Sequence, residues 1–188
     1  MNLAIFGGTF DPIHNAHLTV AREAASKFRL DKVLFIPAAH PPHKPEVGGD
    51  DYHHRLRMVE LACEDEPIFE ASSLESVGAK SYSIDTIEKL RATLAPGDRL
   101  FFVIGADAFA EIATWHRWRD VVAQVEFIVV TRPGHEYTAP PEARVHRLDT
   151  LALPVSSSEI RRQLAESESP GELPPKVLEY IRANRLYM

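Results

Sequence analysis

Residues 4–18 read AIFGGTFDPIHNAHL, and the organisation of the chain can be worked out from this stretch. The apolar residues 3–6 predict a short buried strand. Residues 16–28 carry apolar side chains at helical spacing and predict the helix that follows. A strand, a glycine-rich turn and a helix in this order indicate the start of an α/β fold.

The turn between strand and helix has the features of an anion site. Gly7 and Gly8 lack a Cβ, so backbone and ligand can approach closely. The helix N-terminus offers free N–H groups and about half a positive charge. His14 and His17 lie one turn apart and add two donors. The alternatives are a simple tight turn, or a metal site built on the HxxH pair, for which the sequence supplies no neighbouring cysteine or second acidic ligand.

The same alternation continues along the chain. Short apolar runs predict strands at residues 3–6, 33–36, 68–70, 100–104 and 127–130, and amphipathic stretches predict helices at 16–28, 52–63, 84–94 and 175–184. Residues 40–51, 134–142 and 166–175 are predicted loops. We expect a Rossmann-like, doubly wound and mostly parallel sheet with helices on both faces and a C-terminal helical segment. Ligands of such sheets bind at the carboxyl ends of the strands.

Composition excludes several classes of protein. The chain has 188 residues, 45% of them hydrophobic, and a formal net charge of −6, which argues against nucleic-acid coating and membrane-surface binding by bulk charge. Cys63 is the only cysteine, so neither an intramolecular disulfide nor a cysteine-based zinc site can form. With no signal peptide or long apolar stretch, we expect a cytoplasmic protein with one domain, 1–188, whose helical part is 155–188. Self-association into a homo-oligomer stays open.

The stretch GGTFDPIHNAH resembles the signature of the HxGH nucleotidyltransferase superfamily, in the form typical of the pyridine mononucleotide adenylyltransferases of bacteria. Ala16 stands where that pattern has Gly. The resemblance implies transfer of the adenylyl group of ATP to nicotinate mononucleotide, giving deamido-NAD and pyrophosphate. It makes His14 and His17 catalytic, and it assigns ATP and phosphate binding to Gly7, Gly8, Thr9 and Phe10.

A second phosphate site is predicted near the C-terminus. Ser156 and Glu159 form a capping box, which marks the start of a helix. Taken alone, the segment 154–161 is a capped helix with exposed arginines. Its resemblance to the family motif ISSTxIR makes Arg161 a phosphate ligand, assisted by Ser157.

Two loops after predicted strands add to the ATP side. In residues 40–44 (HPPHK), Lys44 is either a solvated lysine or, by resemblance to the family, a cation for the phosphates. Gly105 and Asp107 follow the strand 100–104. Asp107 can cap a helix, or its carboxylate can hold a ribose diol, as the family's GxD motif implies.

Three residues are implied for the acceptor nucleotide. Thr86 is predicted to lie about 200° from Ile84 around its helix, off the apolar stripe, and the resemblance lets it bind the nicotinate carboxylate. Trp115 is either core or the residue that stacks on the pyridine ring. Arg132 either adds charge near the phosphates or braces its loop.

The expected chemistry needs no protein nucleophile, since the attacking phosphate oxygen is already an anion. Mg²⁺ is expected to arrive on the ATP phosphates, with no protein metal site. Other functions compatible with the sequence are the same transfer to nicotinamide mononucleotide or to phosphopantetheine, and a nucleotide-sensing or metal-binding module without enzymatic activity.

Overall fold

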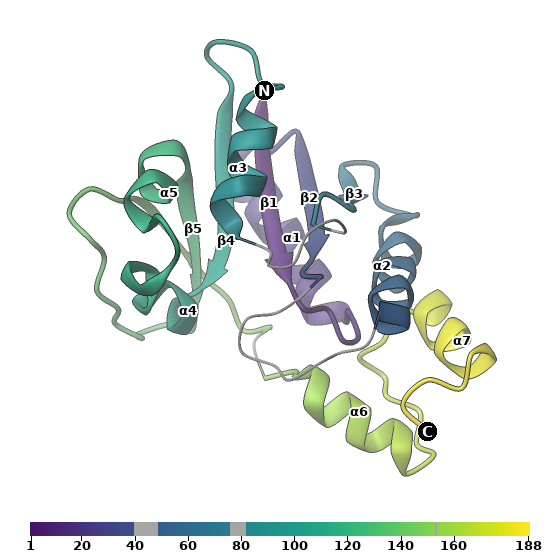
Figure 1. Ribbon diagram of the computed structural model, residues 1–188. Helices are drawn as coiled ribbons and strands as arrows, with labels where there is room; N and C mark the ends of the chain where they lie inside the picture. Colours follow the sequence, from purple (N-terminus) through teal and green to yellow (C-terminus); the bar gives the residue numbers. More distant parts are fainter. Residues whose placement is uncertain (40–48, 76–81, 153) are drawn as a thin grey trace.

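The computed structural model describes residues 1–39, 49–75, 82–152 and 154–188 (Figure 1). These residues form one six-stranded sheet in the order β3-β2-β1-β4-β5-β6, and every neighbouring pair is parallel. The strands are β1 (Asn2–Gly8), β2 (Lys32–Pro37), β3 (Phe69–Ala71), β4 (Arg99–Gly105), β5 (Glu126–Thr131) and β6 (Arg144–Asp149). The expected parallel, doubly wound sheet is confirmed.

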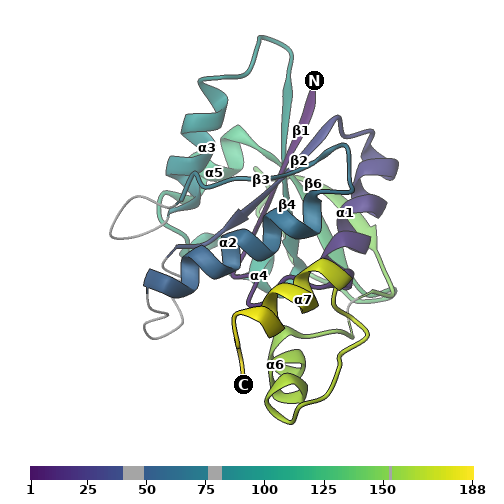
Figure 2. The ribbon, with the colours of Figure 1, turned by 90° about the vertical axis from the view of Figure 1, so that its right-hand side faces the viewer.

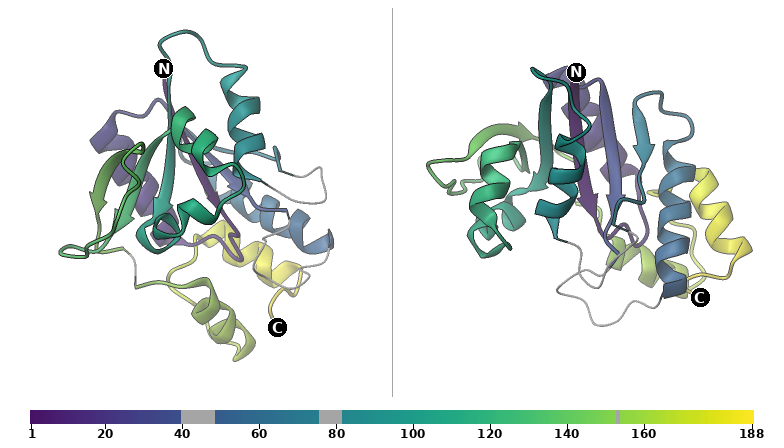
Figure 3. Two further views of the ribbon diagram at one scale, coloured as in Figure 1. Left: turned by 60° about the vertical axis from the view of Figure 1, so that its left-hand side comes forward. Right: turned by 45° about the horizontal axis from the view of Figure 1, so that its top comes forward.

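Helices cover both faces of this sheet. A hydrophobic cluster on one face, called the first cluster, joins the sheet to α1 (Asn15–Phe28), α2 (Gly49–Cys63), α6 (Ser157–Ala165) and α7 (Pro175–Ala183). The second cluster joins the other face to α3 (Ser83–Arg91), α4 (Ala106–Ala110), the 3-10 turn Ile112–Thr114 and α5 (Trp118–Gln124). Figures 1 and 2 show α6 below the carboxyl ends of the strands, and Figure 3 shows α7 running beside α2.

Alternation along each strand divides the core between the two faces. In β1, Ala4 belongs to the first cluster, while Leu3 and Ile5 belong to the second. In β4, Phe101 and Phe102 divide in the same way. A strand buried on both sides needs a continuous apolar run, which is the pattern that the sequence shows for the central strands.

The strand order reverses between β1 and β4. From β1 the chain adds β2 and β3 on one side of the sheet, and it then adds β4, β5 and β6 on the other side. Parallel strands end at the same edge, so the turns after Gly8 and Gly105 are neighbours there. This is the place where doubly wound sheets bind ligands.

Two parts of the sequence interpretation need correction. Residues 49–51 belong to α2 and not to a loop; the rest of that predicted loop lies outside the described residues. Strand β6 was not predicted, since its sequence RVHRLD lacks an apolar run. It lies at the edge of the sheet, where His146 bonds to Glu126 of β5 at 2.8 Å, so polar residues suffice there. No helix within the described ranges is long and apolar enough to cross a membrane.

Candidate active site

Two adjoining cavities open at the carboxyl edge of the sheet. The first, called the His17 cavity, has a volume of about 320 Å³ and is lined by Phe6, His14, Ala16, His17, Val20, Gly105, Val130, Ala152, Val155, Ser156 and Ser157. The second, called the Asp107 cavity, has a volume of about 370 Å³ and is lined by Gly105, Ala106, Asp107, Val130, Thr131, Arg132 and His135. Gly105 and Val130 belong to both, so the two cavities share a wall.

Gly105 is the open part of that wall. A Cβ placed on Gly105 would meet no described atom within 4 Å. Its backbone, at φ −68° and ψ 149°, does not require glycine. The absence of a side chain at Gly105 therefore keeps space open between the cavities. The backbone conformation of the turn does not depend on it. Ala16, which replaces the family's Gly, also lines the His17 cavity.

The two histidines are held in fixed positions at the start of α1. His14 is the residue before the first turn, and its backbone N–H donates to Nδ1 of His17 at 3.2 Å. The two rings stack with their centroids 3.7 Å apart. Because Nδ1 of His17 accepts a hydrogen bond, the proton of the neutral ring sits on Nε2. His17 is thus prepared as an Nε2–H donor.

Burial keeps both rings uncharged. It lowers the pKa of His14 to about 4, and burial together with the charge of His14 lowers the pKa of His17 to about 3. Nδ1 of His14 is buried and, among the described residues, has no hydrogen-bond partner. A buried polar atom without a partner is costly, and a bound ligand would supply one. Both histidines therefore present neutral hydrogen-bonding groups.

The second predicted phosphate motif packs directly against the first. The hydroxyl of Ser156 accepts from the backbone N–H of Glu159 at 3.2 Å, which confirms the helix start. Ser157 Oγ donates to the carbonyl of Pro12 at 2.9 Å, and Arg161 Nη1 donates to the carbonyl of Asp11 at 2.6 Å. The N-terminus of α6 thus faces the turn that precedes α1.

Arg55 is a site residue that the sequence did not reveal. It lies on α2, its side chain is fully buried, and Nη1 donates to the carbonyl of Thr9 at 2.7 Å. Its Nε and Nη2 atoms have no hydrogen-bond partner in the described part of the chain, although Nε lies 3.7 Å from the carboxylate of Asp51. Arg55 thus holds the backbone of the glycine turn at Thr9.

The glycine pair itself has a packing role. A Cβ on Gly8 would lie 2.9 Å from the ring of Phe10, whose side chain is buried in the first cluster. Gly7 has more room, with its nearest neighbour, Phe102, at 3.8 Å. Gly7, Gly8, Thr9 and Phe10 do not line either of these two cavities.

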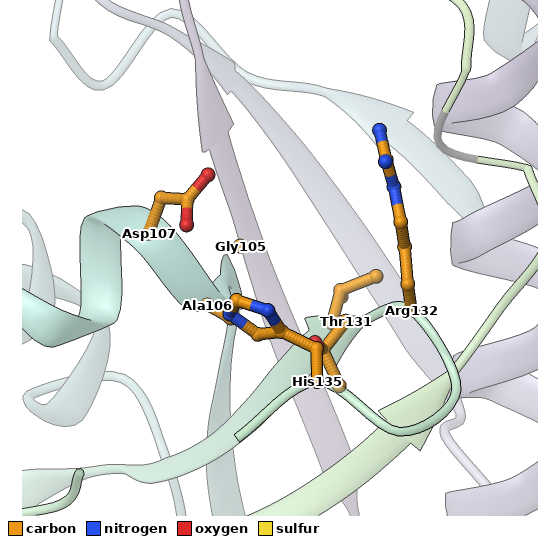
Figure 4. Close-up of a pocket in the computed structure, with 7 residues that line it drawn as sticks. Gly105, Ala106, Asp107, Thr131, Arg132 and His135 are labelled. Atoms are coloured by element: carbon orange, nitrogen blue, oxygen red, sulfur yellow. The ribbon is translucent and has the colours of Figure 1, made fainter. Parts of the chain in front are cut away.

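The Asp107 cavity brings together residues from two neighbouring loops. Asp107 stands in the first turn of α4, and Arg132 directly follows β5. Figure 4 shows their side chains extending on opposite sides of Gly105. His135 lines the same cavity and was not predicted. The sequence signal for His135 was its place in the loop after β5, two residues beyond Pro133.

Thr86 is enclosed by other parts of the chain. It is buried, only 3% exposed, and its hydroxyl donates to the carboxylate of Glu75 at 3.1 Å. The helix angle did place it off the apolar stripe, but the chain after β3 covers that side: Leu74 packs on the second cluster next to α3. Trp115 is half-buried on the same cluster, edge-on to Phe102 at 5.8 Å.

Thr86 and Trp115 line neither of the two cavities, and Arg161 does not line them either. Lys44 lies outside the described residues. The described residues contain no group of three His, Cys, Asp or Glu side chains that could hold a metal ion. Of the predicted site residues, His14, His17, Gly105, Asp107, Ser157 and Arg132 are the ones that line the two cavities.

Comparison with known proteins gives a consistent result. Residues 5–163 match the cytidylyltransferase-like family. A protein of Solibacter usitatus named probable nicotinate-nucleotide adenylyltransferase is 63% identical over 187 residues, covering 100% of both chains. A protein of the same name from Citrifermentans bemidjiense is 42% identical, covering 100% of this chain and 99% of the relative.

Solved structures share the fold. Nicotinic acid mononucleotide adenylyltransferase of Plasmodium falciparum complexed with NaAD superposes with a TM-score of 0.81 at 21% identity, covering 99% of this chain and 97% of that one. Its complex with APC gives a TM-score of 0.78 at 20% identity, covering 99% and 96%.

Proposed function

This chain belongs to the cytidylyltransferase-like family and, within it, to the nicotinate-nucleotide adenylyltransferases, and from that membership we propose that it transfers the adenylyl group of ATP to nicotinate mononucleotide. The products are nicotinate adenine dinucleotide and pyrophosphate. As a nucleotidyltransferase, it acts on small molecules that must meet in one site.

The observation that carries the proposal is the shared wall of the two cavities. A nucleotide whose ribose and phosphates are held by different residues needs one continuous space that joins these residues. Gly105 keeps that space open at the point where the strand order reverses. The histidine pair borders the space on one side, and Asp107 and Arg132 border it on the other.

The reaction is a direct displacement. A phosphate oxygen of the mononucleotide attacks the α-phosphorus of ATP, a new P–O bond forms, and the bond to the β-phosphate oxygen breaks. Pyrophosphate leaves with the electron pair of that bond. No protein nucleophile is needed, and Cys63 is unsuited because burial raises the pKa of its thiol to about 12. Catalysis then depends on positioning and on stabilising charge.

The residues divide this work by their chemistry. His17 Nε2–H and His14 donate to the phosphate oxygens on which charge develops. Arg161, together with Lys44 and Ser157, holds the outgoing pyrophosphate, and the turn Gly7–Phe10 approaches the nucleotide through its backbone. Gly105 and Asp107 take the ribose of ATP.

The acceptor is held by three further residues. Thr86 and nearby N–H groups bind the nicotinate carboxylate, Trp115 stacks on the pyridine ring, and Arg132 adds positive charge near its phosphate. These assignments follow the family, and Thr86 must then exchange its partner Glu75 for the substrate carboxylate.

Enzymes of this kind typically use a divalent metal ion, and we propose Mg²⁺. Mg²⁺ keeps several of its waters and binds substrate phosphates, so we propose that the ATP phosphates and water hold it. Bound there, it would neutralise part of the triphosphate charge. We also propose that residues 1–188 act as one catalytic domain in the cytoplasm.

The test presents ATP and Mg²⁺ with each acceptor in parallel and measures pyrophosphate and product mass. We expect turnover with nicotinate mononucleotide and much less with nicotinamide mononucleotide or phosphopantetheine. Absence of product with both pyridine mononucleotides would refute the proposal. A preference for nicotinamide mononucleotide would change the acceptor but not the reaction.

A further inference from the structure

The last residues of the chain contact the turn that leads into the catalytic helix. Beyond α7, Leu186 and Tyr187 pack on the first cluster, and Tyr187 Oη donates to Oδ1 of Asp11 at 2.5 Å. Figures 1 and 2 show the chain end beside α6. A contact between residues 176 positions apart joins the C-terminus to the FDPIH turn.

The same aspartate lies next to Arg161. Arg161 donates to the backbone carbonyl of Asp11 at 2.6 Å, but its Nη1 is 3.6 Å from Oδ2 of that residue. A charge-assisted hydrogen bond between guanidinium and carboxylate is about 2.7–2.9 Å long. The side chains are therefore close enough to attract each other, yet they do not form the short, paired contact that they could form.

The hydroxyl of Tyr187 accounts for this arrangement. It binds Oδ1 and fixes the orientation of the carboxylate, which in this orientation does not form a bidentate pair with the guanidinium. Burial and the bond to Asp11 raise the pKa of Tyr187, which keeps it a donor at neutral pH. Arg161 is 31% exposed, and its Nη2 donates to the neutral hydroxyl of Ser158 at 3.3 Å, a contact that a phosphate can replace.

We propose that Tyr187 is a positioning residue: it holds the carboxylate of Asp11 away from Arg161, so that this guanidinium can bind the polyphosphate end of the nucleotide. The inference rests on the proposed function for its link to catalysis. The effect of Tyr187 on phosphate binding by Arg161 does not depend on which nucleotides react.

Charges near this contact are mixed. Burial raises the pKa of Asp51 on α2, the charge of Asp11 raises it further, and Arg55, His54 and Arg161 offset part of this rise. Two carboxylates thus lie beside Arg161. Without the hydroxyl of Tyr187, Asp11 would turn toward that arginine, and phosphate would have to compete with it.

The test uses Tyr187→Phe, which removes the hydroxyl and keeps the ring. The matched control is Tyr180→Phe on α7, whose hydroxyl contacts Nδ1 of His54 at 2.8 Å and does not touch the turn. Affinity for pyrophosphate is measured by calorimetry, and kcat and both KM values by pyrophosphate release. We expect Tyr187→Phe to weaken pyrophosphate binding and lower kcat about tenfold, a cost of about 1.4 kcal/mol, with KM for the mononucleotide unchanged. Tyr180→Phe stays at wild-type values.

A rescue experiment separates positioning from mere support of the fold. Asp11→Asn removes the charge that competes for Arg161, so Asp11→Asn/Tyr187→Phe should bind pyrophosphate more tightly than Tyr187→Phe alone. Wild-type affinity in Tyr187→Phe, or a double variant no better than the single one, would overturn the inference. Pyrophosphate binding needs no acceptor, so a wild-type protein that is inactive with pyridine mononucleotides refutes the proposed function while this readout still decides the role of Tyr187.

Discussion

The imidazole rings of His14 and His17 stack 3.7 Å apart, and the backbone N–H of the first donates to Nδ1 of the second. This one hydrogen bond determines the tautomer of His17. It also means that the pair can stabilise phosphate charge without carrying charge itself, because burial keeps both pKa values far below neutrality. Neutral donors that are fixed before the substrate arrives cost little reorganisation during reaction.

His17→Ala should lower kcat by a factor on the order of 100 or more, since it removes a fixed donor to the reacting phosphates. Steady-state pyrophosphate release measures the effect. His53→Ala is the control, because His53 is exposed on α2. A folded His17→Ala protein with near-normal turnover would remove this histidine from its proposed role.

The histidine pair should also make the fold sensitive to acid. Each ring takes up a proton near pH 6.5 when unfolded, but only near pH 4 or pH 3 when folded. The unfolded state therefore binds more protons below pH 6.5, and the free energy of unfolding falls as the pH falls. Between pH 7 and pH 5 we expect a loss of up to about 2 kcal/mol for each histidine.

Urea unfolding at several pH values measures this loss. Glu126, whose pKa is lowered to about 2, chiefly by its hydrogen bond with Arg99, loses its stabilising effect only below pH 4.5, so the window from 6.5 to 4.5 reports on the histidines. His14→Asn/His17→Asn should flatten the pH dependence there. Equal slopes for the variant and the wild type would show that these rings titrate normally.

Substitution by alanine should affect binding at Gly105 and stability at Gly8. A Cβ on Gly105 meets open space at the wall shared by the cavities, whereas a Cβ on Gly8 meets the ring of Phe10 at 2.9 Å. Gly105→Ala should change the free energy of unfolding by less than about 0.5 kcal/mol and raise the KM of a nucleotide. Gly8→Ala should cost about 1–3 kcal/mol of stability through overpacking.

Thermal unfolding and steady-state kinetics on the two variants check this pair. The Gly105→Ala protein acts as its own folding control, since unchanged stability with impaired binding is the expected combination. A destabilised Gly105→Ala protein with normal KM values would contradict the role assigned to the shared wall.

The sequence predicted the central sheet because its strands are buried on both faces and need continuous apolar runs. Strand β6 was missed because an edge strand can carry Arg144 and His146 and still pair through its backbone. The same reasoning located His14, His17, Gly105 and Asp107, since each lies in a turn at the end of a central strand or at the start of the helix that follows it.

Residues that act from a distance were not predictable. Arg55 and Arg57 stand two positions apart on α2, and nothing in their local sequence separates them. The structure buries Arg55 against Thr9 and leaves Arg57 at the surface, paired with Glu60. Only the tertiary placement of α2 makes this distinction. The burial of Thr86 was not predictable for a similar reason, because the segment after β3 covers it.

The contact between Thr86 and Glu75 leads to the last prediction. The hydroxyl proposed to bind the nicotinate carboxylate already donates to a carboxylate of the protein at 3.1 Å. The substrate must displace a group of its own charge, and the displaced negative charge then stays near the site. Glu75→Gln removes that charge and should lower the KM of nicotinate mononucleotide several-fold. Nicotinamide mononucleotide has an uncharged amide in place of the carboxylate and should gain little, so the ratio of kcat/KM for nicotinate over nicotinamide mononucleotide rises. Glu88→Gln, on the same helix as Thr86 but paired with Arg117 at 2.8 Å, should leave that ratio unchanged. Equal gains for both acceptors in Glu75→Gln would indicate a general loosening of the segment and would argue against Thr86 as the carboxylate ligand.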